Sequence, residues 1–157
     1  MQIVLLAVGK TTDSHLIALI SEYKSRLKHY INFSIEEIPE NKKTKRASEE
    51  IQKEIEGKSI VQRLKPNDFV VLLDEKGREY TSIEFSKFIQ KQMNISTKRL
   101  VFVIGGPFGF SEEIYNLANK KFSLSRLTFS HQMVRLFFVE QLYRAFTILR
   151  NEPYHHQ

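Results

Sequence analysis

The sequence predicts an α/β fold, a mostly parallel sheet with helices on both faces. Apolar runs rich in β-branched residues alternate with helical patterns long enough to cross from one parallel strand to the next. Three of the runs are continuously apolar, which is typical of parallel strands buried on both faces. With 157 residues, the chain is long enough for one core and too short for two, so we expect a single domain over residues 1–157.

Four runs predict strands. Residues 2–8, 68–73 and 99–104 are uninterrupted apolar runs, which predicts central strands. Residues 33–38 mix apolar and acidic side chains, which favours a strand at the edge of the sheet. A further short run, residues 122–124, precedes the last part of the chain.

Helical spacing of apolar residues fills the segments between these runs. It predicts helices over residues 14–29 and 48–64. Thr81 and Glu84 form a capping box that begins a third helix, expected to reach residue 92.

The last predicted helix, residues 131–149, has apolar side chains around nearly its whole circumference. Such a helix must be buried on more than one side, and a monomer of this size offers little room for that. We therefore expect a homodimer with this helix in a two-fold interface. The alternative is a central helix in a monomeric core.

Residues 99–113 form an apolar run, a glycine-rich loop and the start of a helix, with Ser111 as the predicted N-cap. The loop lacks the lysine of a P-loop and the spacing of a Rossmann fingerprint, and Glu112 and Glu113 would repel a phosphate. We expect it to hold a ligand, the alternative being a strand-to-helix turn without one. Three glycines permit positive φ angles and a close approach of the ligand to the backbone: Gly105, Gly106 and Gly109.

Composition excludes several classes of protein. The chain has no cysteine, which excludes disulfides, thiolate catalysis and cysteine-ligated metal sites, and we expect no metal. No apolar run approaches the roughly 20 residues of a membrane-spanning helix. The apolar N-terminus has no basic region before it, unlike a signal peptide, so we expect a cytoplasmic location.

The net charge of +6 suggests a polyanionic partner such as nucleic acid, although a surplus of solvated lysines would give the same balance. A basic cluster at residues 42–46 lies in a polar segment, residues 39–47, that we expect to form a mobile loop. Further basic residues in the second half are candidates for phosphate contacts: Lys87, Lys91, Lys98, Arg99, Lys120, Lys121, Arg126, Arg135, Arg144 and Arg150.

Six motifs together resemble the RlmH family, small bacterial methyltransferases of the SPOUT superfamily. Their order along the chain is far more specific than any one of them, and they extend from one end of the sequence to the other. The motifs occupy residues 7–10, 72–77, 104–109, 124–131, 140–145 and 153–155.

The resemblance implies a homodimeric α/β fold with a deep trefoil knot in the C-terminal part, and S-adenosyl-L-methionine (SAM) as the methyl donor. It implies that the substrate is the N3 nitrogen of a pseudouridine in the helix-69 loop of 23S rRNA, methylated in the assembled ribosome. Physical reasoning alone would predict an unknotted sheet, because threaded chains are rare among folds. The resemblance overrides that expectation.

The resemblance also implies a donor pocket. A cationic, phosphate-free ligand agrees with the missing P-loop lysine and is compatible with Glu112 and Glu113. Apolar walls and free backbone groups suit an adenine ring. The residues implied in cofactor binding are Leu73, Gly105, Gly106, Leu124, Ser125, Arg126, Leu127, Thr128 and Phe129.

For catalysis, the resemblance points to Tyr154 and His155 in the C-terminal tail and to Arg144. We expect the tail to close over the donor pocket, with His155 as the better candidate for the proton acceptor. A frayed terminus is the alternative. Which group accepts the proton, and which protomer's tail completes each site, is left open by the sequence.

Three neighbouring residues receive weaker assignments. His131 is expected to have a structural or RNA-orienting role, and Arg135 to pair across the dimer or to contact RNA phosphate. Ser130 stands where the family pattern leads us to expect proline, which leaves the rigidity of this turn undetermined.

Two other functions fit parts of the sequence. A basic RNA-binding or ribosome-associated module without catalysis would explain the charge but would leave the glycine loop unused. A related SPOUT-like methyltransferase that acts on transfer RNA would share the fold and the methyl donor.

Overall fold

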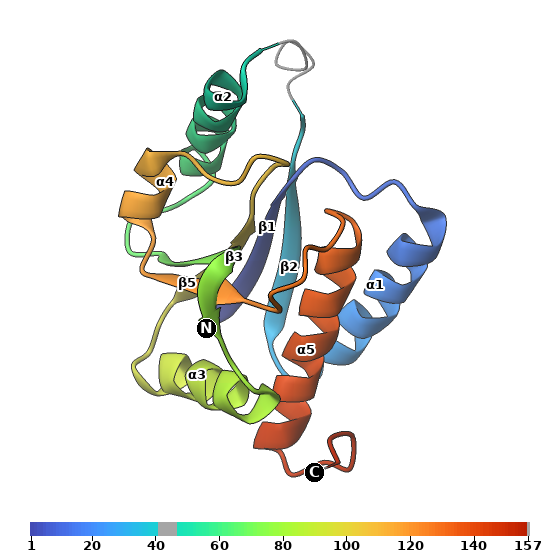
Figure 1. The fold of residues 1–157 in the computed structure, drawn as a ribbon. Coiled ribbons are helices and arrows are strands. Elements are labelled where there is room, and N and C mark those ends of the chain that lie inside the picture. The colour runs from blue at the N-terminus through green and yellow to red at the C-terminus, as the bar shows by residue number, and fades with distance from the viewer. Residues whose placement is uncertain (41–46, 157) are drawn as a thin grey trace.

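The structure, a computed structural model, describes residues 1–40 and 47–156, so the predicted basic cluster at residues 42–46 lies outside the described residues. It contains one five-stranded sheet in the order β2-β1-β4-β3-β5, and every neighbouring pair of strands is parallel. Helices cover both faces of the sheet (Figure 1). The elements are β1 (Gln2–Val8), α1 (Ser14–Leu27), β2 (Asn32–Ile38), α2 (Glu49–Val61), β3 (Phe69–Glu79), α3 (Ser82–Asn94), β4 (Arg99–Ile104), α4 (Glu112–Leu117), β5 (Lys120–Ser123) and α5 (Met133–Leu149).

The strand predictions are confirmed, with one substantial difference. β3 does not end at Leu73 but continues to Glu79, and it pairs with β5 both before and after a register shift between Leu73 and Arg78. Gly77 permits the second pairing, because a Cβ atom there would lie 2.6 Å from the backbone nitrogen of Phe122. The irregular segment between the two pairings is the part of β3 that reaches the candidate site.

The helices also follow the prediction, and the first two end earlier than expected. The amide of Tyr30 donates to the carbonyl of Leu27, and the amide of Leu64 to that of Val61, so each helix tightens into a turn. The capping box of Thr81 and Glu84 is present.

The core has two halves, one on each face of the sheet. Along β1, alternate residues point to opposite faces: Ile3 and Leu5 pack with α1, α3 and α5, whereas Val4 and Leu6 pack with α2 and α4. This explains the continuously apolar strands, because each is buried on both sides.

The long helix α5 lies between α1 and α3, against the sheet (Figure 1). This packing within one chain buries most of the apolar surface that led us to expect a dimer. Met133 and Phe137 remain exposed at 36% and 39%, and the ring of Phe137 lies 4.9 Å from that of Phe129. An apolar patch of these three residues is therefore what α5 leaves for a partner.

Two of the arginines considered for phosphate contacts are structural. Arg99 is 7% exposed and forms ion pairs with Asp68 at 2.5 Å and with Glu36 at 3.1 Å. Arg135 is 1% exposed. The expectation that they contact RNA is wrong, because neither guanidinium can reach a phosphate without unfolding.

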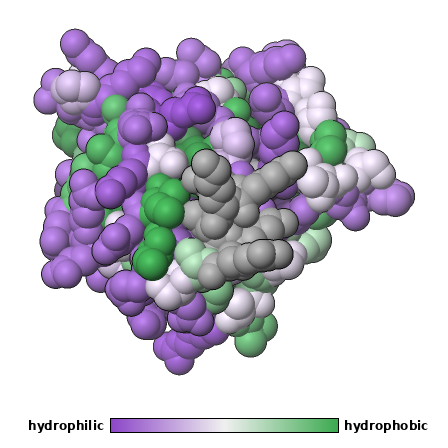
Figure 2. All heavy atoms as spheres, turned by 90° about the horizontal axis from the view of Figure 1, so that it is seen from above, coloured by the Kyte–Doolittle hydropathy of each residue, from purple (hydrophilic) through white to green (hydrophobic). Residues whose placement is uncertain are grey.

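Seen from above, the surface of the described residues is mostly hydrophilic, and the hydrophobic residues visible there form separate small groups (Figure 2). Within the described part of the chain, no helix is long and apolar enough to cross a bilayer.

Candidate active site

A cavity of about 340 Å³ opens at the carboxyl ends of β3 and β4, which is where ligands bind in open α/β sheets. Its walls come from the irregular segment of β3, the glycine loop after β4, the segment after β5 and the start of α5. The volume lies at the lower end of the range for small-molecule sites. Its lining includes Leu73, Asp74, Glu75, Ile104, Gly105, Gly106, Phe108, Tyr115, Phe122, Leu124, Ser125, Leu127, Thr128, Phe129, His131 and Val134.

Of the nine residues expected to bind the cofactor, eight line this cavity. Arg126 does not: it is exposed, and its Nε atom donates to Glu79 at 3.1 Å. The segment after β5 therefore contributes through its other residues. Ser125 shapes that segment, because its hydroxyl accepts from the amide of Leu127 at 3.0 Å and its carbonyl accepts from Ser123 at 2.9 Å.

The glycine loop is a tight turn, in which the amide of Gly109 donates to the carbonyl of Gly106 at 3.2 Å. Of its three glycines only Gly109 has a positive φ, +82°. Close packing explains the other two, because a Cβ atom would lie 2.9 Å from Phe110 at Gly105 and 2.1 Å from Glu56 at Gly106.

The acidic side chains at the cavity are not the ones that the sequence suggested. Glu112 and Glu113 are exposed and do not line it, whereas Asp74 and Glu75 of β3 do. Tyr115 donates to Asp74 at 2.5 Å, and burial together with this bond raises the pKa of Tyr115 to about 12. Tyr115 is thus a neutral donor that holds the Asp74 carboxylate at the cavity, where it favours a cationic ligand.

Sequence reasoning missed Asp74, Glu75 and Tyr115. The signal was present for the first two, because they directly follow the buried run that ends at Leu73, and strand ends meet at the site. Tyr115 gave no signal, since its position depends on how α4 packs on the sheet.

The predicted N-cap of α4 is only partly correct. Ser111 occupies the N-cap position, but its hydroxyl caps no backbone amide and is buried without a partner. The hydroxyl faces α2, where a Cβ atom at Gly57 would lie 2.4 Å away. Close packing of α2 on α4 thus fixes this serine.

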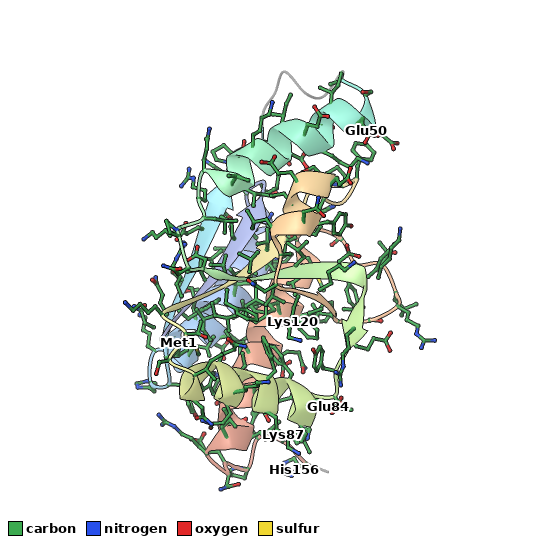
Figure 3. The ribbon with its side chains drawn as sticks, turned by 90° about the vertical axis from the view of Figure 1, so that its left-hand side faces the viewer. Met1, Glu50, Glu84, Lys87, Lys120 and His156 are labelled. Atoms are coloured by element: carbon green, nitrogen blue, oxygen red, sulfur yellow. The ribbon has the colours of Figure 1, made fainter. Side chains whose placement is uncertain are left out.

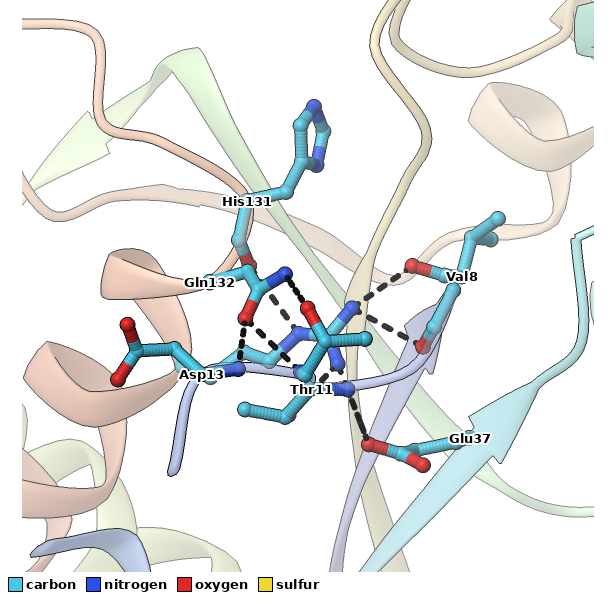
Figure 4. Close-up of polar contacts among 9 residues, drawn as sticks. Val8, Thr11, Asp13, Glu37, His131 and Gln132 are labelled. Atoms are coloured by element: carbon cyan, nitrogen blue, oxygen red, sulfur yellow. Dashed lines mark hydrogen bonds and ion pairs between the residues drawn. The ribbon is translucent and has the colours of Figure 1, made fainter. Parts of the chain in front are cut away.

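Hydrogen bonds of Arg135 join the start of α5 to the end of β1, where Figure 4 labels its partners Val8 and His131. Its guanidinium donates to the carbonyls of Val8 and Gly9 at 2.9 and 3.0 Å, to Thr11 at 2.8 Å and to Glu37 at 3.3 Å, and its Nε to the carbonyl of His131 at 3.1 Å. The expectation of a dimer or RNA contact is therefore wrong. Arg135 fixes the first turn of α5, which forms part of the cavity wall.

The turn before α5 is ordered without the expected proline. The hydroxyl of Ser130 accepts from the amide of Met133 at 3.2 Å, so it caps the first turn. His131 follows and lines the cavity. Desolvation, and then the charge of Arg135, lower the pKa of His131, so its ring is neutral at pH 7.

The three residues expected to act in catalysis form one cluster. Arg144 Nη1 lies 3.4 Å from Nδ1 of His155, and its guanidinium carbon lies 4.8 Å from the ring centre of Tyr154. Glu140 joins the cluster, because it accepts from Arg144 Nη2 at 2.7 Å and from the hydroxyl of Tyr154 at 3.0 Å. Glu140 lies one turn before Arg144 on α5, a spacing that could have revealed the pair.

The protonation states in the cluster follow from its contacts. Burial, and then hydrogen bonds to Tyr23 and Glu140, raise the pKa of Tyr154, so its hydroxyl stays protonated. Because Arg144 can only donate, Nδ1 of His155 is the acceptor in this contact. Nε2 is buried without a partner.

The cluster does not lie at the cavity of its own chain. Val134, at the cavity, and Arg144 are ten residues apart on α5, which is about 15 Å along the helix axis. His156, beside the cluster, lies at the end of the molecule near Lys87, opposite Glu50 of α2 (Figure 3). The tail therefore does not cover the cavity of its own protomer, and the prediction that a tail closes over the donor pocket stays open for the tail of a second protomer.

Among the described residues, no group of three or more His, Cys, Asp or Glu is placed to hold a metal ion.

Comparison with known proteins identifies the family of the chain. Residues 1–155 match a family described as "Predicted SPOUT methyltransferase". Proteins named "Ribosomal RNA large subunit methyltransferase H" are similar over 100% of both chains, at 60% identity in Christiangramia forsetii, 58% in Flavobacterium johnsoniae and 56% in Parabacteroides distasonis. With this coverage, and with a cavity at the carboxyl ends of its parallel strands, the chain belongs to the SPOUT methyltransferase family.

Proposed function

We propose that this protein, a single domain of 157 residues, transfers a methyl group from SAM to N3 of a pseudouridine in the helix-69 loop of 23S rRNA. Its place of action is the assembled ribosome in the cytoplasm. The names of its relatives support ribosomal RNA of the large subunit as the substrate. The family's trefoil knot remains an expectation for the fold.

The observation that carries the proposal is the cavity between β3, the glycine loop and the segment after β5. Its residues suit SAM. Leu73, Leu124 and Phe129 give apolar walls for adenine, and Gly105 and Gly106 let the backbone approach the ligand without an intervening side chain. Asp74 and Glu75 supply negative charge for a cationic ligand without a phosphate.

SAM, when bound, supplies an electrophilic methyl carbon. The residues of the chain must then hold the N3 atom of the base in line with that carbon and remove its proton. Positioning lowers such a barrier by about 7–11 kcal/mol, and a general base adds about 100- to 10,000-fold. The cavity alone offers few groups for these two tasks. Its histidine, His131, lies just before α5, and its tyrosine, Tyr115, is hydrogen-bonded to Asp74.

The C-terminal cluster supplies the missing groups. Tyr154 is a protonated donor and Arg144 a fixed cation, and both can orient the carbonyl groups of a base. His155 is the proposed proton acceptor. Since its Nδ1 lone pair faces Arg144, His155 can accept the N3 proton only after exchanging that contact for the base, so the tail must rearrange when substrate binds.

We further propose that the site is assembled from two copies of the chain. The exposed residues Met133 and Phe137, with Phe129 packed beside Phe137, and the cluster at Arg144 lie along one side of α5. Residues 133, 137, 140 and 144 follow the spacing of a helix face. If two copies of this face packed in antiparallel fashion about a two-fold axis, the tail of one would meet the cavity of the other.

Methyl transfer from labelled SAM tests the proposal. Intact ribosomes lacking the modification should become labelled in the helix-69 loop of 23S rRNA, with N3-methylpseudouridine as the product by mass spectrometry. Transfer RNA should remain unlabelled. Label in transfer RNA alone would favour the related transfer-RNA enzyme, and the absence of both SAM binding and label would favour a module without catalysis.

A further inference from the structure

We propose that Glu56, on α2, is a positioning residue for the donor cavity, which it supports by holding the glycine loop at Gly106. This inference rests on the proposed function, because the cavity is taken to bind SAM. Glu56 belongs to no motif that pointed to the family, and it does not line the donor cavity.

The glycine loop is a thin wall between two cavities. On one side lies the donor cavity, and on the other a second cavity of about 420 Å³ whose lining includes Lys10, Glu40, Glu56 and Arg135. The two cavities share the wall residues Gly106, Pro107, Phe108 and His131. Gly106 has no side chain. A group that contacts its backbone from the second cavity therefore determines where that backbone lies in the donor cavity.

The Glu56 carboxylate makes that contact. It packs directly against the backbone of Gly106, where a Cβ atom would lie 2.1 Å from Oε2. Gln52, one turn earlier on α2, orients the carboxylate by donating to Oε1 at 2.9 Å. Oε2 is buried without a partner of its own.

Burial of the Glu56 carboxylate is unfavourable for its charged form. Burial raises the pKa of Glu56, and the charge of Glu40 adds to the effect, while Gln52 and Gly106 oppose it. A raised carboxyl pKa contributes stability only in acid, and this contribution is lost as the pH rises through that pKa. The ionised form of Glu56 therefore does not favour folding, which is expected of a group kept for function.

The first experiment measures SAM affinity by calorimetry for the wild type and three variants. Glu56→Ala removes the carboxylate that packs on Gly106 and should weaken SAM binding by about tenfold. Glu56→Gln keeps an oxygen acceptor and should restore most of the affinity. Glu54→Ala, an exposed position on the same helix, is the control and should change nothing.

Kinetics separate positioning from general damage. On ribosomes, Glu56→Ala should raise the KM for SAM and leave both kcat at saturating SAM and the KM for ribosomes close to wild type. Its melting temperature should not fall in proportion to the loss of affinity.

A double-mutant cycle tests the route through Gly106. Gly106→Ala should weaken SAM binding in the wild type, because its methyl group collides with the carboxylate. In the Glu56→Ala background the same change should cost much less, so the two effects should not add.

The outcomes separate the two proposals. A wild-type protein that binds no SAM contradicts the proposed function. A wild type that binds SAM while Glu56→Ala binds it equally well, or with strictly additive effects of Glu56→Ala and Gly106→Ala, overturns the role of Glu56 and leaves the function standing.

Discussion

Replacing Arg135 by methionine should destabilise the fold strongly without touching the ligand directly. The guanidinium is buried and donates to two backbone carbonyls, those of Val8 and Gly9, which no other group can then satisfy. Each orphaned carbonyl costs about 1–3 kcal/mol. Breaking a buried ion pair by removing one partner costs about 3–5 kcal/mol, which agrees with that sum. Glu37 is 33% exposed and is hydrated when Arg135 is removed. The loss of this ion pair therefore costs closer to about 3 kcal/mol than to about 5 kcal/mol.

For a chain of this length, about 3–5 kcal/mol corresponds to a fall in melting temperature of roughly 6–20 °C. The assay is thermal unfolding followed by circular dichroism. Arg135→Lys should not restore stability, because one ammonium group cannot replace five directed bonds. Arg144→Met is the matched control on the same helix, where a partly exposed pair is worth about 1 kcal/mol or less. If Arg135→Met melted as close to the wild type as Arg144→Met does, the structural role of Arg135 would be refuted.

Four further predictions concern the site. Arg144→Met should lower turnover on ribosomes about 100-fold, the cost of misplacing a reacting group by about 1 Å, with SAM affinity near wild type by calorimetry; equal turnover would remove Arg144 from the mechanism. Deleting residues 153–157 should likewise abolish turnover and spare SAM binding, and a fully active truncated chain would mean that the tail is only a frayed end. Because the pKa of His131 is lowered, its neutral ring stabilises the fold above the ordinary histidine value of 6.5, and this is lost as the pH falls through the lowered pKa. SAM affinity should fall over the same range, as a cationic ring would repel the sulfonium, and His131→Gln should flatten the profile; an unchanged profile contradicts this. Phe137→Glu should give monomers by analytical ultracentrifugation that bind SAM but do not methylate, whereas an active monomer would refute the shared site.

Much of the fold was predictable because burial on both faces leaves a clear pattern in the strands. β1 and β4 have the predicted bounds, since their apolar runs end where the strands end. The length of β3 was not predictable. Its second half carries exposed polar residues and is a strand only because Gly77 lets β5 approach.

The part of the site that was predictable is the glycine loop, because glycine marks positions where a side chain would not fit. Gly105 and Gly106 line the cavity as expected, although the reason for each is a neighbouring side chain rather than a positive φ. The role of Arg135 was not predictable, because a guanidinium that bonds carbonyls of β1 looks, in sequence, like one that faces solvent. The motif at residues 140–145 separated Arg144 from Arg135, but it gave no sign of the structural role of Arg135.

The expected dimer shows another limit of sequence reasoning. The apolar circumference of α5 indicated burial on several sides, but it could not distinguish packing against α1 and α3 from packing against a second chain. The structure assigns most of that surface to the chain itself, and leaves Met133 and Phe137 exposed.

The claim that a cavity and a distant cluster combine between two copies can be tested with mixed dimers. One protomer would carry Ser125→Arg, which places a cation in the donor cavity, and the other would lack residues 153–157. Each variant alone should be inactive on ribosomes. Mixing them should restore methyl transfer, because one dimer type then joins an intact cavity to an intact tail. Activity of the truncated variant alone, or no recovery in mixtures shown to contain heterodimers, would contradict the account.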